Sequence, residues 1–264
     1  MMIGIGSWSY HLARRSNKMD FAGYIDRVAQ ILEGIDSKGI EIDFRDLFEA
    51  RDKGKIPEMA KKLRQHNLKP GVHLGSLYLH PEKAEREASL AKQIEALELM
   101  NQIGADTGAT HTRYQGRVSR EGNIRIAREM CEKLASEAAK YDIRIALENY
   151  ELFKGEDIER IIKGDYGNLG LNNDTGNWLI VGEDPLTMTE RFLPLTFYVH
   201  LKDFKFREGE WASAVYGQGA VDFPRILDLL KKAPDPLVAL EIDITHGDED
   251  DFLCKSVEYF KKLI

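Results

Sequence analysis

Residues 39–45 read Gly-Ile-Glu-Ile-Asp-Phe-Arg, and from residue 40 onward apolar and charged side chains alternate. A period of two is typical of a β-strand, because successive side chains point to opposite faces of the sheet. The alternation puts Glu41, Asp43 and Arg45 on one face and the apolar residues on the other. This stretch therefore predicts a strand with one polar face.

Seven further β-like runs occur along the chain, and longer segments of helical period separate them. The expected strands are residues 2–8, 39–44, 70–74, 110–114, 144–149, 169–174, 197–202 and 238–242. The expected helices include residues 21–35 after the cap Asp20, 81–103, 121–141, one that begins at 222–224, and 249–264. Eight βα units favour a single (β/α)8 TIM barrel, with residues 1–264 as one domain. The polar face of residues 40–45 is then expected to point into the barrel mouth.

Composition limits the function. The chain has 264 residues and a net charge of −7, whereas a protein that binds nucleic acid usually carries a basic face, so no nucleic-acid partner is expected. The first residues lack a secretory signal and no run of about 18 apolar residues follows, which predicts a cytoplasmic protein without membrane contact. Cys131 and Cys254 indicate neither a disulfide nor a CxxC metal site. Residues 4–9 lack the third glycine of a dinucleotide fingerprint, so NAD is not expected.

Four good metal ligands stand at the ends of the last four expected strands, the positions that carry the active site of a parallel barrel. They are Glu148, Asp174, His200 and Glu241. Three carboxylates in a partly buried site would repel one another, and a divalent cation removes that cost. The oxygen-rich set favours one hard ion, Mn²⁺ first, with Mg²⁺, Co²⁺ or Zn²⁺ as alternatives. Each acid taken alone could equally be an ordinary strand-end carboxylate paired with Lys or Arg.

Five motifs carry a resemblance to a known family. They are residues 146–149 (Ala-Leu-Glu-Asn), 174–177 (Asp-Thr-Gly-Asn), 200–203 (His-Leu-Lys-Asp), 217–224 (Gly-Gln-Gly-Ala-Val-Asp-Phe-Pro) and 240–242 (Leu-Glu-Ile). In this order they make nearly the whole chain resemble the xylose isomerase-like TIM-barrel superfamily. Within it, the chain is similar to the sugar phosphate isomerase/epimerase family, which includes D-tagatose 3-epimerase-like enzymes. The resemblance implies that Glu148, Asp174, His200 and Glu241 are the metal ligands, and that Glu148 and Glu241 form the acid/base pair.

The chain also departs from its relatives. The family often has a histidine three residues after its aspartate, where this chain has Asn177, which can bind a substrate hydroxyl but cannot carry a proton. Endonuclease IV is similar in strand order but needs three zincs and further histidines. His73 matches one of these histidines, whereas Arg113 stands near where the histidine of the fourth strand would be. No Asp-x-His occurs between residues 203 and 217, so DNA repair is not expected.

The implied chemistry is proton abstraction next to a carbonyl, through an ene-diolate that a metal stabilises. We therefore expect a divalent-metal-dependent isomerase or epimerase of a sugar or sugar phosphate. Its partner would be a small-molecule carbohydrate, and a homo-oligomer is one possibility. The first alternative is a metal-dependent dehydratase of a keto-inositol or a dehydroshikimate-like keto acid, since the same enolate could expel a hydroxyl. The second alternative is a non-catalytic sugar-binding barrel.

Other residues near strand ends are candidate substrate contacts. They are Trp8, His73, Arg113, Asn177 and Lys202. Lys202 and Arg113, and more weakly Arg45, could bind a substrate phosphate or carboxylate, or could pair with neighbouring aspartates. Trp8 could offer an apolar wall to a sugar ring or could be buried against loops. A structural role is as good an interpretation for His73 as substrate contact, and His111 is expected to be structural.

Overall fold

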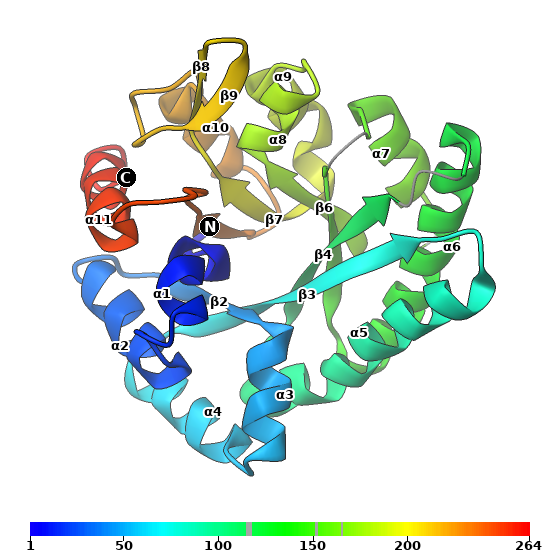
Figure 1. The fold of residues 1–264 in the computed structure, drawn as a ribbon, viewed down its shortest axis with the longest axis horizontal. Helices are drawn as coiled ribbons and strands as arrows, with labels where there is room; N and C mark the ends of the chain where they lie inside the picture. Colours follow the sequence, from blue (N-terminus) through cyan, green and yellow to red (C-terminus); the bar gives the residue numbers. More distant parts are fainter. Residues whose placement is uncertain (115–117, 151–152, 165) are drawn as a thin grey trace.

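The structure is a computed structural model that describes residues 1–114, 118–150, 153–164 and 166–264. Eight parallel strands form one sheet in the order β1-β10-β7-β6-β5-β4-β3-β2, which curls into a nearly closed barrel with helices outside it (Figure 1). The strands are β1 (Met2–Ile5), β2 (Gly39–Asp43), β3 (Lys69–Leu79), β4 (Thr107–Tyr114), β5 (Arg144–Glu148), β6 (Leu169–Asp174), β7 (Thr196–Leu201) and β10 (Leu237–Leu240). The predicted TIM barrel is confirmed.

The barrel closes between its two edge strands, β1 and β2. Ile3 and Lys38 make an isolated parallel bridge there, and the Ile3 amide donates a hydrogen bond to the Ser37 carbonyl at 3.0 Å. Closure brings the inward-facing residues of β2 across the interior from those of β7 and β10. Residues far apart in the chain can therefore meet inside the barrel.

A small apolar cluster fills the barrel interior nearer the amino ends of the strands. Its members are Met2, Ala109, Ala146, Phe197, Tyr198, Leu237 and Ala239. Small residues oppose the large ones: a Cβ on Gly71 would lie 2.5 Å from Leu237 Cδ2 and 2.8 Å from Tyr198 Cε2. Glu148, His200 and Glu241 each stand two positions after a member of this cluster. They face the same interior, one layer nearer the carboxyl ends of the strands.

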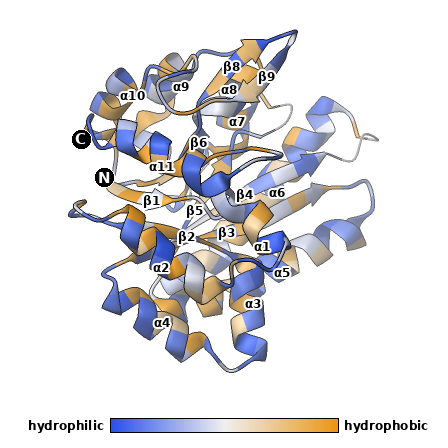
Figure 2. Cartoon of the chain, turned by 60° about the vertical axis from the view of Figure 1, so that its left-hand side comes forward, coloured by the Kyte–Doolittle hydropathy of each residue, from blue (hydrophilic) through white to orange (hydrophobic). Residues whose placement is uncertain are grey.

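The helices surround the sheet and bury their apolar stripes against it. Figure 2 shows mostly hydrophobic strands inside helices that carry hydrophilic residues as well. The longer helices are α1 (His11–Arg15), α2 (Phe21–Ile31), α3 (Phe44–Asp52), α4 (Ile56–Gln65), α5 (Lys83–Ile103), α6 (Arg120–Ala138), α7 (Gly155–Ile162), α8 (Thr175–Ile180), α9 (Pro185–Phe192), α10 (Phe223–Leu230) and α11 (Glu249–Phe260). Short 3-10 helices are η1 (Ser7–Tyr10), η2 (Ala139–Tyr141) and η3 (Leu193–Leu195), and β8 (Phe204–Arg207) pairs with β9 (Glu210–Ser213) in a hairpin after β7. Within the ranges that the structure describes, no helix combines the length and the apolar composition needed to cross a membrane.

The predicted helix caps explain where two helices begin. The Asp20 side chain accepts a hydrogen bond from the Gly23 amide at 2.8 Å, and α2 then buries Tyr24 and Val28. Asp222 caps α10 in the same way, through the Arg225 amide. These helices start where the sequence predicted them.

The predicted ends of five strands lie one to three residues beyond the observed ends, namely those of β1, β2, β5, β7 and β10, and after β1 and β2 a helix begins instead. β1 ends at Ile5, and Trp8 belongs to η1 rather than to the end of a strand. Arg45 does not continue β2, because the Asp43 side chain accepts a hydrogen bond from the Arg45 amide at 2.9 Å and caps α3. By contrast β3 is longer than predicted: a register shift between His73 and Ser76 lets it run on beside β4. A bulge of this kind re-aims the side chains around it.

Candidate metal centre

The acids at the carboxyl ends of β5, β6 and β10 converge on one histidine of β7. His200 Nδ1 lies 3.7 Å from Glu148 Oε2 and 3.9 Å from Asp174 Oδ2. The same nitrogen lies 3.5 Å from Glu241 Oε2. None of these four side chains is more than 5% exposed, so their charges face one another with little water between them. The structure thus brings together all four residues predicted as ligands.

Glu41 of β2 is a fifth member that the sequence analysis did not include among the site residues. Its Oε2 lies 2.7 Å from His200 Nε2, on the opposite side of the ring from the three acids. The Ser7 amide and hydroxyl both donate to Glu41 Oε1, at 2.9 and 2.7 Å. When His200 is neutral, a proton on Nε2 can be donated to Glu41, which leaves the Nδ1 lone pair facing the acids and the Asn172 amide, whose Nδ2 lies 3.2 Å away. A carboxylate behind a histidine in this way orients many metal ligands.

Lys202 brings a buried cation into the same cluster. Its Nζ lies 2.8 Å from Asp174 Oδ2 and 2.8 Å from Glu241 Oε1. The neighbouring Asp203 does not pair with it. Instead Asp203 Oδ2 accepts hydrogen bonds from the amides of Gly217 and Gly219, both at 2.9 Å, and so anchors the loop of residues 217–224. Lys202 therefore lies among the predicted ligands rather than on a separate substrate subsite.

Burial and charge compete in setting the pKa values of this cluster. Burial lowers the pKa of the His200 imidazole, but the carboxylates of Glu241 and Glu41 outweigh burial and hold that pKa well above its ordinary value. Burial raises the pKa of Asp174 above its ordinary value, although the Lys202 ammonium opposes the rise. The surrounding carboxylates thus favour a proton on His200, and burial favours a proton on Asp174.

The cluster fits a divalent cation. Four buried carboxylates face only Lys202 and His200, and a divalent ion bound at His200 Nδ1 would replace the proton of that ring while it neutralises most of the remaining negative charge. Asp174 Oδ2 is buried, and among the described residues its charged neighbours are Lys202 Nζ at 2.8 Å and His200 Nδ1 at 3.9 Å. A Cβ on Gly6 would lie 2.9 Å from Glu241 Oε2, so the glycine keeps open the space beside that carboxylate. Such an oxygen-rich set with one imidazole suits a hard or borderline divalent ion.

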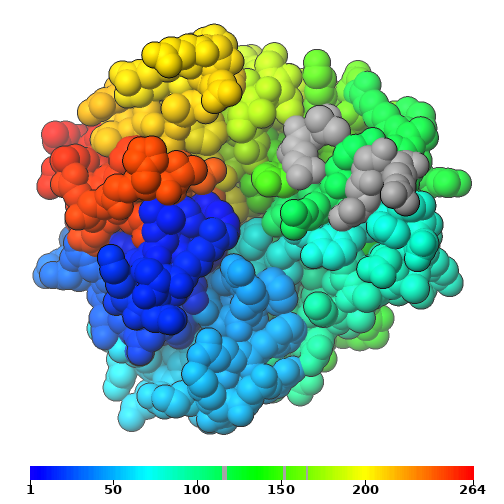
Figure 3. Space-filling view, in the orientation of Figure 1, coloured from blue at the N-terminus to red at the C-terminus, as the bar shows by residue number. Residues whose placement is uncertain are grey.

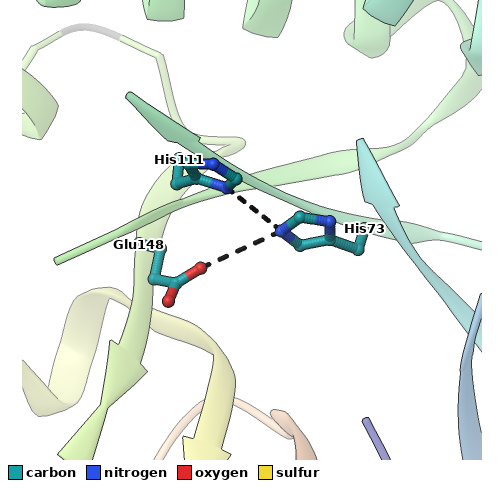
Figure 4. A group of neighbouring side chains, drawn as sticks. All are labelled: His73, His111 and Glu148. Carbon is teal, nitrogen blue, oxygen red and sulfur yellow. Dashed lines mark hydrogen bonds and ion pairs between the residues drawn. The ribbon is translucent and has the colours of Figure 1, made fainter. Parts of the chain in front are cut away.

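A second group of ligand-type side chains adjoins this one (Figure 4). His111 Nδ1 lies 3.2 Å from His73 Nε2, and His73 Nε2 lies 4.0 Å from Glu148 Oε2. Burial, helped by the charge of His73, lowers the pKa of His111 to about 4. Arg113 was predicted to stand near the place of the β4 histidine. The structure puts His111 beside His73, and Arg113, two residues further along β4, is exposed.

Asn177 and Trp8 are engaged with protein groups in the structure. Asn177 Nδ2 donates to Glu148 Oε1 at 2.9 Å, so the amide that replaces the family's histidine holds a predicted catalytic carboxylate. Trp8 Nε1 donates to Asp243 Oδ1 at 3.1 Å, and the indole stacks on His11 with ring centroids 4.4 Å apart. The indole is half-buried against its neighbours. This agrees with the alternative prediction for Trp8, burial against loops, rather than with an apolar wall for a sugar ring.

Arg45 also pairs within the protein. Its Nε and Nη2 donate to Asp43 Oδ1 and Oδ2 at 2.7 and 2.6 Å, although the Arg45 side chain is 65% exposed. A fork-shaped pair of this kind satisfies the aspartate fully. The structure therefore favours the pairing alternative for Arg45 over contact with a substrate anion.

The segment after β1 lies beside the centre and is held by the last helix. Glu249 accepts hydrogen bonds from the amides of Leu12 and Ala13, at 2.6 and 2.8 Å. In the space-filling view the blue N-terminal residues and the orange residues near the C-terminus lie side by side (Figure 3). This contact holds α1, which directly follows η1, the short helix from which Ser7 reaches Glu41.

Comparison with known proteins shows what the chain is similar to. The family described as xylose isomerase-like TIM barrel matches residues 29–263. No curated protein matches the chain in sequence. Among solved structures, a D-tagatose 3-epimerase-like protein is 18% identical with a TM-score of 0.77, and the match covers 100% of this chain and 97% of that one.

Two further solved structures have the same fold. The IolI protein, whose structure contains a zinc atom, is 16% identical with a TM-score of 0.78, over 100% of this chain and 98% of its own. A probable 3-DHS dehydratase, AsbF from Bacillus anthracis, is 16% identical with a TM-score of 0.74, over 99% of both chains. At these identities the likeness to each structure shows the fold alone.

Proposed function

The chain belongs to the xylose isomerase-like TIM-barrel family, and from that premise we propose that it is a divalent-metal-dependent isomerase or epimerase of a sugar or sugar phosphate. Residues 1–264 would form one catalytic domain. The observation that carries the proposal is the convergence of Glu148, Asp174 and Glu241 on His200 Nδ1. Mn²⁺ as the resident ion, a cytoplasmic location and a homo-oligomer stay predictions from the sequence.

The four residues would hold the ion through three carboxylates and one imidazole nitrogen. An ion held there would supply Lewis-acid chemistry: it would polarise a substrate carbonyl and make the neighbouring C–H bond more acidic. Glu41 contributes by holding the His200 ring through Nε2, at 2.7 Å, so that Nδ1 faces the acids. The protein thus orients a compact set of ligands before the ion binds.

Glu148 and Glu241 are the proposed acid/base pair. Each of the two carboxylates has one oxygen committed to a neighbour: Glu148 Oε1 to the Asn177 amide at 2.9 Å, and Glu241 Oε1 to Lys202 Nζ at 2.8 Å. Burial raises the pKa of Glu148, but the charge of His200 outweighs burial and holds the pKa well below its ordinary value. With an ion bound, its charge would take over from the His200 proton in keeping Glu148 ionised. Glu148 could then accept the proton of a substrate C–H bond, and Glu241 could return a proton to the other face or the neighbouring carbon.

A dehydratase is the second candidate, and Lys202 is the observation that favours it. Its ammonium is a buried cation within the cluster, 2.8 Å from two carboxylates, where it could bind the carboxylate of a keto acid or protonate a departing hydroxyl. The AsbF structure shares the fold. The product separates the two candidates, because only dehydration forms an enone.

The experiment that tests the proposal is deuterium exchange. The protein loaded with Mn²⁺ is incubated in D₂O with ketoses, ketose phosphates, keto-inositols and dehydroshikimate, and NMR follows each substrate. We expect deuterium to enter next to a carbonyl, and Glu148→Gln and Glu241→Gln to abolish that exchange. Glu132→Gln, at a partly exposed Glu132 on α6 paired with Arg128, is the matched control and should exchange like the native protein.

Three outcomes would contradict parts of the proposal. Native exchange in either variant would eliminate the two-base mechanism. Ultraviolet absorbance of an enone product would assign the protein to the dehydratases. Failure to bind any metal, measured by elemental analysis, would remove the proposed centre and favour a sugar-binding barrel without catalysis.

A further inference from the structure

Arg113 stands in the inner wall of the barrel mouth. Ala109 belongs to the apolar cluster inside the barrel, and alternate residues of a strand share one face, so His111 and then Arg113 follow on the inner face of β4. The intervening Thr112 and Tyr114 face outward, where they line a small pocket with side chains of α6. His111 therefore lies in the layer of the proposed metal centre, and Arg113 lies in the next layer toward solvent.

The wall reaches this height because β3 and β4 are long. Figure 1 shows them as two long neighbouring arrows, and beyond the register shift in β3 they stay paired to their last residues. Ser76 Oγ lies 2.6 Å from His111 Nε2, so the face of β3 that carries Ser76 is also an inner one. Tyr78 follows on that face, is the register partner of Arg113 and is 37% exposed. The two long strands thus place an arginine beside a tyrosine above the proposed centre.

The charge of Arg113 is not taken up by a neighbouring acid. The two other cations predicted as anion contacts are engaged: Lys202 Nζ lies 2.8 Å from Asp174, and Arg45 forks onto Asp43. Within the part of the chain that the structure describes, no carboxylate pairs with the Arg113 guanidinium, and the side chain is exposed. A guanidinium offers five N–H donors in a planar fork that fits the oxygens of a phosphate or carboxylate. These donors are available to an anionic group of a substrate.

We propose that Arg113 is a specificity-determining residue, which selects substrates with a phosphate or carboxylate over neutral sugars. The inference rests on the proposed function, because the metal centre fixes the level at which the reacting carbon lies. Two residues of a strand rise about 6–7 Å, so Arg113 begins that far beyond the level of His111, where the far end of the substrate extends. The anion is remote from the bond that breaks, and its contact with Arg113 therefore lowers KM rather than raising kcat.

Calorimetric binding to the Mn²⁺-loaded protein tests the inference independently of turnover. The probes are D-fructose 6-phosphate, which carries a phosphate, 3-dehydroshikimate, which carries a carboxylate, and neutral D-fructose. We expect the native protein to bind one or both anions about 10- to 100-fold more tightly than D-fructose, the range of a hydrogen bond to a charged group. The anion that binds more tightly identifies the group that Arg113 recognises.

Variants at Arg113 separate a fitted contact from the general charge of the mouth. Arg113→Gln should bind the anions no more tightly than D-fructose, and Arg113→Lys, which keeps the charge without the fork, should retain part of the preference. Arg45→Gln is the matched control, since it removes another cation at the carboxyl end of a strand, 65% exposed, and should keep the native preference. Native affinity for D-fructose is the check on folding. Added KCl should narrow the preference of the native protein and leave Arg113→Gln unchanged.

The outcomes distinguish this inference from the proposed function. Equal affinities of the native protein for all three probes, no binding of any probe, or a preference that survives in Arg113→Gln would overturn the role of Arg113. Deuterium exchange with a neutral ketose would in those cases leave the proposed function standing. A preference that is lost in Arg113→Gln, without exchange in any substrate, would support the anion contact and count against the isomerase or epimerase. Where exchange occurs, Arg113→Gln should raise KM about 10- to 100-fold for the anionic substrate and leave kcat near its native value.

Discussion

Replacing Glu41 by glutamine tests how the barrel prepares His200 as a ligand. In Glu41→Gln the remaining side-chain oxygen can keep both hydrogen bonds from Ser7, but the new NH₂ group then faces His200 Nε2 across the 2.7 Å contact. Two donors would meet there. Either the side chain turns and loses Ser7, or the imidazole proton moves to Nδ1 and blocks the nitrogen that faces the acids.

The expected result of Glu41→Gln is weaker metal binding in a folded protein. Loss of a carboxylate behind a metal-binding histidine weakens binding about 10- to 100-fold, which is about 1.4–2.7 kcal/mol. Calorimetric titration with Mn²⁺ measures the change. Asp46→Asn is the matched control, because Asp46 is another buried carboxylate, 4% exposed, but pairs with Arg14 outside the centre; it should bind Mn²⁺ with native affinity.

The pH dependence of this effect follows from the pKa of His200. The carboxylates of Glu241 and Glu41 raise that pKa, so an ion must displace a proton and the apparent affinity of the native protein falls as the pH falls. Without the Glu41 charge the proton competes less. The deficit of Glu41→Gln should therefore be largest at alkaline pH and shrink toward acid pH. Native affinity at every pH would refute the role given to Glu41.

Three further predictions follow from the same cluster. Lys202→Met leaves Asp174 and Glu241 without their cation, so the metal-free variant should be about 3–5 kcal/mol less stable than the native protein. Mn²⁺ should bind this variant at least about tenfold more tightly. Calorimetric melts with and without Mn²⁺ check both effects, and an unchanged melting temperature of the metal-free variant would contradict the ion pairs. Asn177→Leu removes the 2.9 Å hydrogen bond to Glu148 Oε1, which should cost about 1–3 kcal/mol of stability. It should also lower kcat more than it changes the Kd for Mn²⁺, and a native kcat would show that this hydrogen bond does not position Glu148. In protein held at a free Mn²⁺ concentration of about 100 times the Kd, removal of the ion with a chelator should lower the free energy of unfolding by about 2.7 kcal/mol and the Tm by roughly 5–10 °C. A constant Tm after verified removal would mean that the ion does not bind the folded state preferentially.

The sequence was sufficient for the architecture because its strands are strongly patterned. Residues 145–148 and 237–241 are apolar runs that end in an acid, and the repeat of such ends predicted both the barrel and the convergence of Glu148 and Glu241. Their side-chain direction follows from the strand period alone. For this reason the four predicted ligands do meet at His200 Nδ1.

The parts that the sequence did not predict depend on three-dimensional closure or on local capping. Glu41 meets His200 only because the barrel closes across 159 positions of the chain, and no local pattern carries that information. The neighbour of His73 depends on the bulge before Ser76, which selects His111. The end of β2 was predictable in principle, since Asp43 is a good helix cap and α3 begins directly after it.

Anomalous diffraction at the manganese edge, from crystals grown with Mn²⁺, would locate the ion. We expect a peak within bonding distance of His200 Nδ1 and the carboxylates of Glu148, Asp174 and Glu241, with Lys202 Nζ moved away from Asp174. A crystal at saturating Mn²⁺ with no peak there, or with Lys202 still between Asp174 and Glu241, would contradict the claim that these residues form a metal centre.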